Sequence, residues 1–207
     1  MQLFLNTTSP FARLVRVAAI EKGCINQVQL HGCDPWSNAP ALLAQHPQAR
    51  IPVLVTEAGD AIAESLLIAQ YLDQLDGPAR LVPAEHASAV LARTSVAYGL
   101  MEAAFNVVIA RKNDGALVAD ASLMGQRRLA AIDRVLVQLE AAPPATIPHK
   151  TGHTTGALTL DQITTVVALA YVQFRLPALL PIGGYPQLCQ WLAHAEQRPS
   201  LHSTQFV

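Results

Sequence analysis

The order of strand-like and helix-like segments in residues 1–76 places the strongest constraint on the fold. Apolar residues recur at helical spacing between Phe11 and Ala19, which predicts a helix over residues 10–22 that ends at Gly23. The other predicted segments are strands at 2–5 and 27–31, a short helix at 37–47, a hairpin of 51–55 and 60–63, and a helix at 64–75. This order indicates a small mixed α/β sheet of the thioredoxin-like type.

The remainder of the chain shows only helical periods. Two long helical segments are predicted over 87–141, followed by a Pro/Gly/Thr-rich loop at 142–156 and helices at 159–174 and 185–197. Thr159 and Gln162 have the spacing of a capping box at the start of the third helical segment. We therefore predict an α/β plus all-α chain, with a thioredoxin-like domain at 1–76, a linker at 77–86 and an all-helical domain at 87–207.

Composition and cysteine usage narrow the class of protein. The 207 residues are 51% hydrophobic and 14% charged with a net charge of −1, so no basic surface is expected to bind nucleic acid. Cys24, Cys33 and Cys189 form neither a CxxC pair nor a metal-ligand pattern, which favours a reduced cytoplasmic protein. The strand-like start leaves no room for a signal peptide, and the longest apolar run is too short to span a bilayer.

Ser9 and Pro10 open the first predicted helix. Serine is a favoured N-cap and proline a favoured first helical residue, so capping alone explains the pair. The same geometry also suits a functional role, because a helix N-terminus stabilises an anion and a hydroxyl there can donate to a bound thiolate. The dipeptide by itself leaves both interpretations open.

Two further short segments carry the same ambiguity. Pro52 precedes a predicted strand, where a trans proline is common, but a cis bond would turn the Val53 backbone toward an extended peptide-like ligand. Glu64 and Ser65 end a strand and start a helix. Ser65 is either a plain N-cap or, with the helix dipole, a carboxylate site, beside which Glu64 would pair with an amino group.

Taken in order, these segments resemble the glutathione transferase family. "SPFARLVRVAAIEKG" resembles the first helix of its serine-type classes, "HPQARIPVLV" its cis-proline segment, and "AIAESLLIAQYLD" its Glu-Ser helix. "TLDQI" resembles the capping box of its helical domain, while "YGLMEAAF" and "RPSLHSTQF" are similar to a bacterial branch. The chain departs from the family pattern at His46, where asparagine is usual, and at Gln162, where aspartate is usual.

The resemblance implies a site, a co-substrate and an assembly. Glutathione is expected as co-substrate, extended along Arg50, Ile51, Pro52 and Val53, with its γ-glutamyl end at Glu64 and Ser65. Ser9 is the implied catalytic residue, whose hydroxyl would stabilise the thiolate for attack on a small hydrophobic electrophile. The resemblance also implies a homodimer with a role in detoxification.

A pocket for the electrophile is predicted less directly. Tyr98, Met101 and Phe105 are three and four residues apart on one helical face and, with Phe11, form a candidate wall, although such a stripe also suits a core. Arg13 and Arg16 face either the sulfur site or solvent.

Other arrangements and activities remain open in the sequence. His149 and His153 have a spacing that suits a metal but lack a nearby Cys or acidic partner, so no metal is predicted. A glutathione-dependent thiol reductase would be expected to carry cysteine in place of Ser9, a glutathione-dependent peroxidase is a further alternative, and the Ser-Ser-Cys signature of maleylacetoacetate isomerases is absent. A non-catalytic ligand-binding or structural protein with the same fold is the remaining alternative.

Overall fold

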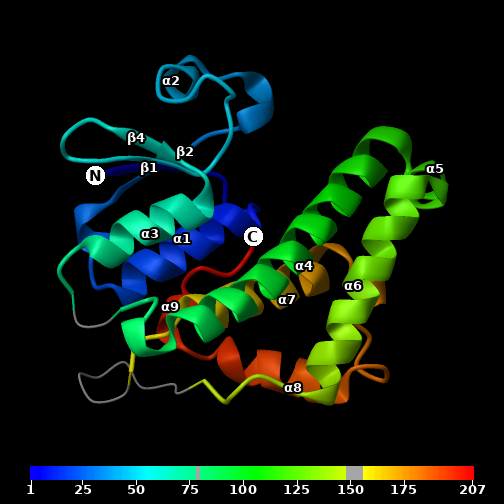
Figure 1. Cartoon of the computed structure of the whole chain (residues 1–207). Coiled ribbons are helices and arrows are strands. Elements are labelled where there is room, and N and C mark those ends of the chain that lie inside the picture. The colour runs from blue at the N-terminus through cyan, green and yellow to red at the C-terminus, as the bar shows by residue number, and fades with distance from the viewer. Residues whose placement is uncertain (78–79, 148–155) are drawn as a thin grey trace.

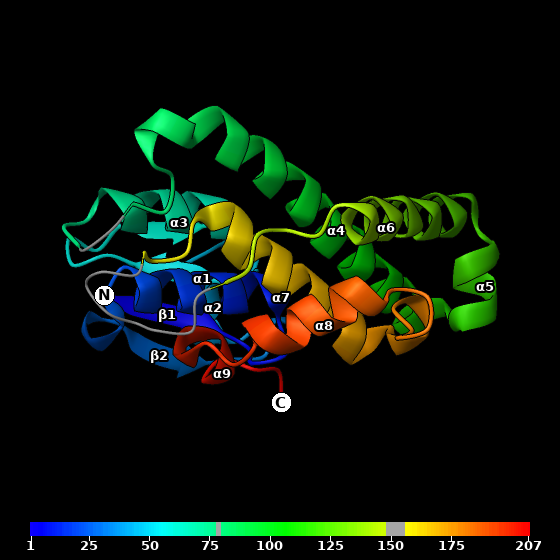
Figure 2. The ribbon, with the colours of Figure 1, turned by 90° about the horizontal axis from the view of Figure 1, so that it is seen from below.

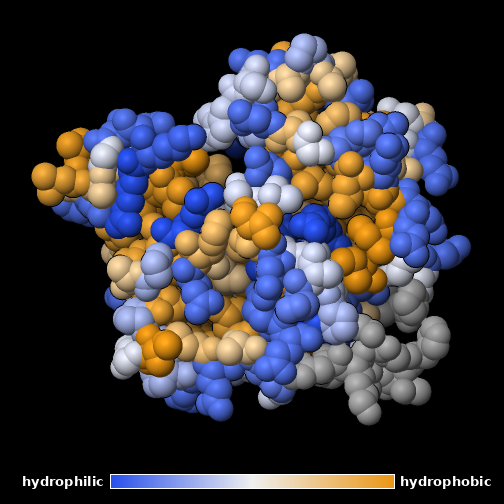
Figure 3. All heavy atoms as spheres, turned by 180° about the vertical axis from the view of Figure 1, so that it is seen from behind, coloured by the Kyte–Doolittle hydropathy of each residue, from blue (hydrophilic) through white to orange (hydrophobic). Residues whose placement is uncertain are grey.

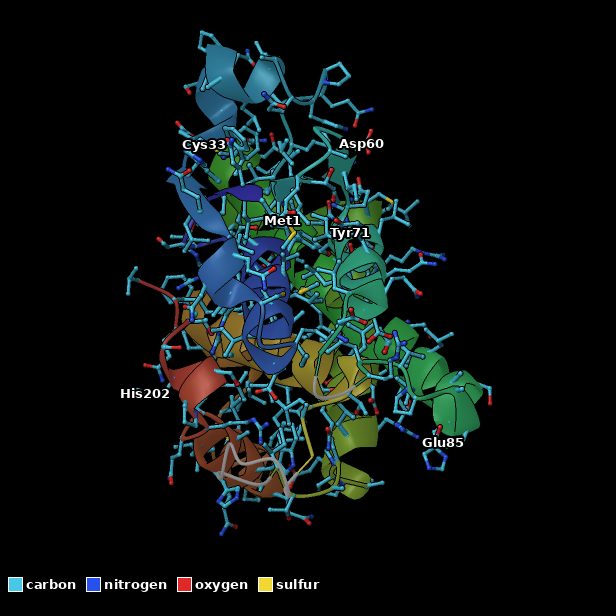
Figure 4. The ribbon with its side chains drawn as sticks, turned by 90° about the vertical axis from the view of Figure 1, so that its left-hand side faces the viewer. Met1, Cys33, Asp60, Tyr71, Glu85 and His202 are labelled. Atoms are coloured by element: carbon cyan, nitrogen blue, oxygen red, sulfur yellow. The ribbon has the colours of Figure 1, made fainter. Side chains whose placement is uncertain are left out.

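The N-terminal part of the chain is built on a four-stranded mixed sheet. The computed structural model describes residues 1–77, 80–147 and 156–207. The strands are β1 (Gln2–Leu5), β2 (Gln29–Gly32), β3 (Val53–Val55) and β4 (Ala61–Ala63), in the order β2-β1-β3-β4. β1 pairs parallel with β2 and antiparallel with β3, and β3 pairs antiparallel with β4. Figure 4 accordingly shows Cys33, just after β2, and Asp60, just before β4, at opposite edges of the sheet.

Two helices cover one face of this sheet and lie side by side in Figures 1 and 4. They are α1 (Pro10–Glu21) and α3 (Ser65–Gln74), while the short α2 (Pro40–Leu43) lies apart at the top of Figure 1. Nine of the 12 residues of α1 are buried, because α1 packs against α3 on one side and against the helical part of the chain on the other. The predicted thioredoxin-like arrangement is confirmed.

The rest of the described chain is helical. Its helices are α4 (Ala87–Asp114), α5 (Ala116–Ala121), α6 (Leu123–Ala141), α7 (Leu160–Arg175), α8 (Pro186–Ala195) and α9 (Pro199–His202). α4 packs against both α6 and α7, and α7 also packs against α1. Figures 1 and 2 show α7 running between α1 and α4, so this helix joins the two parts of the molecule.

The predicted capping box is present at the start of α7. The Thr159 N–H donates to Gln162 Oε1 at 3.0 Å, and both halves of the box are formed. None of the helices in the described part of the chain is long and apolar enough to cross a bilayer.

The local structure departs from the sequence-based segments in three places. Gly115 at φ 77° ends α4, and the Ser122 cap starts α6, so the short α5 separates what were predicted as two long helices. The helix predicted at 37–47 is only α2, preceded by the 3₁₀ turn η2 (Pro35–Ser37) and by Asn38 at φ 51°. α9 was not predicted at all.

The C-terminal segment is attached to α1 by a buried ion pair. The Glu21 carboxylate receives hydrogen bonds from Arg198 Nε at 2.7 Å, Arg198 Nη2 at 2.6 Å and the Leu158 N–H at 3.0 Å, and also from the Ser200 hydroxyl. Glu21 and Arg198 are 6% and 1% exposed. A buried charge is costly unless it is paired and hydrogen-bonded, so separating Glu21 from Arg198 would be unfavourable. This contact therefore fixes the C-terminal segment against the first helix.

Candidate functional site

A cavity of about 910 Å³ lies between the ends of the sheet strands and helices α4 and α7. From behind, the surface is hollowed between the lobe that carries α2 and the arm formed by the far ends of α4 and α6 (Figure 3). This volume is near the upper end of the range for small-molecule sites. The cavity has a polar half, made by residues that precede or start α1 and α3, and a half with an aromatic wall, made chiefly by Phe11, α4 and α7.

Ser9 lies in the polar half at the start of α1. It is 8% exposed and is the N-cap of the helix, accepting from the Ala12 N–H at 3.3 Å. Asn6 Oδ1 accepts from both the N–H and the hydroxyl of Thr8 at 2.8 Å, and this pair shapes the turn that leads to Ser9. Within the described ranges no acceptor takes the Ser9 hydroxyl proton. The side chain therefore caps the helix and still has a donor for a ligand in the cavity.

The Ile51–Pro52 bond is cis, as the resemblance implies for this segment. Ile51 and Pro52 line the cavity, together with Arg50. The Val53 side chain does not line it: it is 0% exposed and packs with Phe4 and Leu42 in a small cluster on the sheet. Any contact of Val53 with a ligand therefore belongs to its backbone.

Glu64 and Ser65 lie at the start of α3, and both line the cavity. Glu64 has φ 69°, a conformation that L-residues adopt rarely and that costs about 1–3 kcal/mol. Its Oε1 accepts from Arg50 Nη1 at 3.0 Å, and both side chains are more than half exposed. Two residues that the sequence assigns separately to a ligand are thus paired with each other.

Ser65 connects the start of α3 to α4. It is 1% exposed, and its hydroxyl donates to Tyr98 Oη at 3.4 Å. Burial raises the pKa of Tyr98, and the Ser65 bond only partly opposes that rise. The Tyr98 hydroxyl is therefore neutral at physiological pH and lies at the boundary between the two halves of the cavity.

Three aromatic rings form the wall of the other half. The Phe11 ring centroid lies 5.7 Å from that of Tyr98 and 5.3 Å from that of Phe105, with the Phe pair edge to face. All three residues line the cavity. Met101 does not: it is 0% exposed within the main core, so its prediction as pocket wall is wrong. α4 packs against both α6 and α7. Of the three residues on its predicted face, Tyr98 and Phe105 therefore line the cavity, whereas Met101 lies in the core.

Arg13 faces neither the sulfur site nor solvent, which corrects the sequence-based expectation. Its side chain is buried, and Nη2 donates to the two Glu196 carboxylate oxygens at 2.8 and 3.0 Å and to the Leu201 carbonyl at 3.0 Å. Arg16 is half-buried and donates to the Ser203 carbonyl at 3.4 Å. Both arginines therefore hold the C-terminal segment rather than a ligand.

The residues that line the cavity but were not predicted from the sequence include Trp36 in η2, Lys112 near the end of α4, and Tyr171 and Arg175 on α7. The Lys112 ammonium lies 5.3 Å from the centre of the Trp36 ring, a contact across the cavity. The sequence shows only that Tyr171 and Arg175 are four residues apart and so share a face of their helix. Nothing local predicts that α7 reaches the cavity.

Tyr171 is 2% exposed, and burial raises its pKa to about 12 although the charge and the hydrogen bond of Arg175 oppose the rise. Its ring packs edge to face on Phe206 at 5.6 Å. The tyrosine hydroxyl is thus a neutral donor, held next to a guanidinium at the cavity surface.

The cysteines and metal-binding groups contribute no visible site. Cys24 is buried, none of the three cysteines lines the cavity, and burial raises the thiol pKa of each. In the described part of the chain no three His, Cys, Asp or Glu side chains are grouped to hold a metal ion. His149 and His153 lie outside the described residues.

Comparison with known proteins agrees with this geometry. Residues 3–80 match the family model for the N-terminal domain of glutathione S-transferases. The uncharacterized GST-like protein YibF of Escherichia coli K12 is 27% identical over 182 residues, covering 84% of this chain and 83% of that protein.

Two crystal structures of a glutathione transferase family member from Pseudomonas fluorescens Pf-5 are similar over 99% of this chain and 98% of theirs. The one with bound glutathione has 29% sequence identity and a TM-score of 0.82. The one with bound S-(propanoic acid)-glutathione has 28% identity and a TM-score of 0.79. Residues 3–80 are therefore similar in sequence to the N-terminal domain of glutathione S-transferases, and the whole chain is similar in fold to these solved structures.

Proposed function

We propose that the protein binds glutathione in the polar half of the cavity and transfers it, through its sulfur, to a small hydrophobic electrophile. One observation carries this proposal: Ser9 at the start of α1 and the adjacent Glu64 and Ser65 at the start of α3 line a single cavity whose opposite wall is aromatic. The Pseudomonas relative with bound glutathione supports it.

The polar half offers a partner for each end of the tripeptide. Glu64 supplies a carboxylate for the γ-glutamyl ammonium, while the Ser65 hydroxyl and the N-terminus of α3 supply donors for the adjacent carboxylate. Ile51, Pro52 and the backbone of Val53 lie along the extended peptide, with Arg50 beside them. In this arrangement the Ser65 hydroxyl exchanges its 3.4 Å contact with Tyr98 for the glutathione carboxylate.

Ser9 would activate the thiol. A free thiol has a pKa of about 8.5, and lowering it by about two units needs roughly 2.7 kcal/mol of differential stabilisation. A hydrogen bond to a charged group contributes about 1.5–3 kcal/mol and a helix N-terminus about 0.3–1 kcal/mol. The Ser9 hydroxyl at the start of α1 therefore supplies an effect of sufficient size.

The thiolate then attacks the electrophile held against Phe11 and Phe105. In a substitution, a sulfur–carbon bond forms while the bond to the leaving group breaks, and the leaving group departs with the electron pair. In an addition to an activated double bond, the π electrons move to the far atom, which takes up a proton. Both reactions form one new thioether and need no oxidant.

The positions of the cysteines disfavour a thiol reductase. A thiol reductase of this kind forms a disulfide between a protein cysteine and glutathione; Ser9 cannot form one, and Cys24, Cys33 and Cys189 do not line the cavity. A non-catalytic carrier of the same ligand remains the alternative. Turnover of glutathione with a reactive aryl halide distinguishes an enzyme from a carrier.

We also propose a subclass, a domain division, a location, a role and an oligomeric state for the protein. They are membership of a serine-type bacterial branch, a division into a glutathione-binding domain at 1–76 and an electrophile-binding domain at 87–207, a cytoplasmic location, a role in detoxification and a homodimer. The last is tested by sedimentation equilibrium, in which a stable monomer at micromolar concentration contradicts it.

The test of the function combines two measurements on the purified protein. The ultraviolet absorbance of bound thiolate, followed as pH is raised, should give a thiol pKa below that of free glutathione. A conjugation assay should show saturable turnover. Binding with a lowered thiol pKa but no turnover with any electrophile indicates a carrier, and no binding refutes the proposal.

A further inference from the structure

The charges that line the cavity are not balanced in its electrophile half. Two carboxylates line the whole cavity, Glu64 and Glu102, and Glu64 is paired with Arg50 at 3.0 Å. Lys112 and Arg175 also line the cavity, and within the described ranges neither has a carboxylate within 4.0 Å. The half that receives the electrophile thus carries two cations without ion-pair partners and one carboxylate, Glu102 on α4.

Aromatic rings, not carboxylates, hold these two cations. The Arg175 guanidinium lies 4.3 Å from the centre of the Phe174 ring, and the Lys112 ammonium lies 5.3 Å from the centre of the Trp36 ring. A ring beneath a guanidinium contacts its face and leaves its N–H edge free for an anion. Both cations are therefore oriented without being neutralised.

Tyr171 adds a neutral donor next to Arg175. The two residues are four apart on α7 and therefore share a face of the helix. Tyr171 is buried, its ring is packed on Phe206, and Phe206 is in turn stacked on Phe174 at 5.3 Å. Burial raises the pKa of Tyr171 to about 12, so the phenol is protonated and can donate to a ligand in the cavity that it lines.

We propose that the electrophile half of the cavity selects a substrate that carries a carboxylate, which binds the Arg175 guanidinium and the Tyr171 hydroxyl, with Lys112 on α4 adding positive charge. The aromatic wall of Phe11 and Phe105 holds the apolar part of the same molecule. This inference rests on the proposed glutathione transfer and names its substrate class: an apolar electrophile with an acidic end.

The test uses ligands that differ only in charge. S-(4-Carboxybenzyl)glutathione and S-(4-carbamoylbenzyl)glutathione have nearly the same shape, as do S-(2-carboxyethyl)glutathione and its amide. Dissociation constants for all four, and for glutathione itself, are measured by calorimetry with wild type, Arg175→Gln, Tyr171→Phe and Arg127→Gln. Arg127 is an exposed arginine on α6 that does not line the cavity, so its variant is matched to Arg175→Gln in net charge.

Wild type and Arg127→Gln should bind at least one carboxylate about tenfold more tightly than its amide. Arg175→Gln should reduce this preference to less than about threefold, and Tyr171→Phe should reduce it in part, with glutathione affinity unchanged in both. Equal binding of acid and amide in both pairs, with glutathione still bound, overturns the substrate class and leaves the proposed function intact. Absence of glutathione binding overturns both.

Discussion

Arg50 Nη1 lies 3.0 Å from Glu64 Oε1, although each residue belongs to a different segment of the candidate glutathione site. The pair is exposed, so its contribution to stability is about 0–1 kcal/mol. Glu64 at the same time has φ 69°, a conformation that glycine adopts without strain. The residue thus has a backbone conformation that disfavours the folded state and a side chain whose ion pair stabilises it little.

Substitutions of Glu64 should therefore separate stability from binding. Glu64→Gly should raise the free energy of unfolding by about 1 kcal/mol by relieving the strain. Glu64→Gln should leave that free energy nearly unchanged. Both should weaken glutathione binding by about tenfold or more, because a hydrogen bond to a charged group is lost. Urea unfolding and calorimetry measure the two effects, and unchanged binding in both variants would exclude Glu64 from the site.

Ser9→Ala should lower turnover far more than affinity. Without the hydroxyl, kcat near neutral pH should fall by about tenfold to a hundredfold, corresponding to about 1.5–3 kcal/mol, and the pKa of the bound thiol should rise. The dissociation constant of glutathione should change by less than about threefold. Equal losses in both would mean that Ser9 positions the ligand and does not activate it.

The matched control for this variant is Ser122→Ala. Ser122 is the N-cap of α6, accepting from the Gly125 N–H at 3.0 Å, and does not line the cavity. Each variant should lose about 1 kcal/mol of stability through its cap, but only Ser9→Ala should lose turnover.

The division of the α4 stripe gives a third pair of variants. Met101→Ala removes a fully buried side chain and should lower the free energy of unfolding by about 2–5 kcal/mol without changing the KM for the electrophile. Phe105→Ala opens the aromatic wall and should raise that KM with a smaller loss of stability. A raised KM for Met101→Ala, measured well below the melting temperature of the variant, would show that Met101 contributes to the electrophile pocket.

The Glu21–Arg198 pair predicts a stability that depends on pH. Burial raises the pKa of Glu21, but hydrogen bonds from Arg198, Ser200 and the Leu158 N–H, with the Arg198 charge, outweigh burial and lower it. The unfolded chain therefore binds more protons at this residue than the folded chain. Its stabilising effect is complete above the ordinary glutamate pKa of about 4.3 and is lost as the pH falls through the lowered value.

Glu21→Gln leaves Arg198 buried without its anion and should cost about 3–5 kcal/mol at pH 7. The difference from wild type should shrink as the pH falls below the ordinary glutamate pKa of about 4.3, because the unfolded wild-type chain then takes up a proton at Glu21 that the folded chain binds only at lower pH. Urea unfolding of both proteins across this pH range measures the difference in their free energies of unfolding. A difference that does not depend on pH would show that Glu21 is protonated throughout.

Short sequence patterns predicted the features that depend on neighbouring residues, such as where a helix begins and ends. The apolar spacing and Gly23 gave the bounds of α1 to within one residue, and the Thr159–Gln162 box gave the start of α7. The polar residues of the candidate site could be proposed because Ser9 starts a helix and Glu64 immediately precedes another, and short motifs of this kind mark helix starts.

Contacts between distant segments could not be predicted in this way. Arg13 is buried because Glu196 and Leu201, 183 and 188 positions away, supply its partners. Tyr171 and Arg175 reach the cavity only because α7 packs between α1 and α4. The spacing of Tyr98, Met101 and Phe105 shows that they share a helix face, but not where the core ends and the pocket begins.

The most direct test of the whole account is a calorimetric titration of glutathione into the wild type and Ser65→Ala, with thermal unfolding to show that both are folded. The account predicts saturable binding to the wild type and an affinity about tenfold or more lower, roughly 1.4 kcal/mol, for Ser65→Ala. Binding that Ser65→Ala leaves unchanged would contradict the proposed γ-glutamyl site. No binding to the folded wild type would contradict glutathione as the ligand.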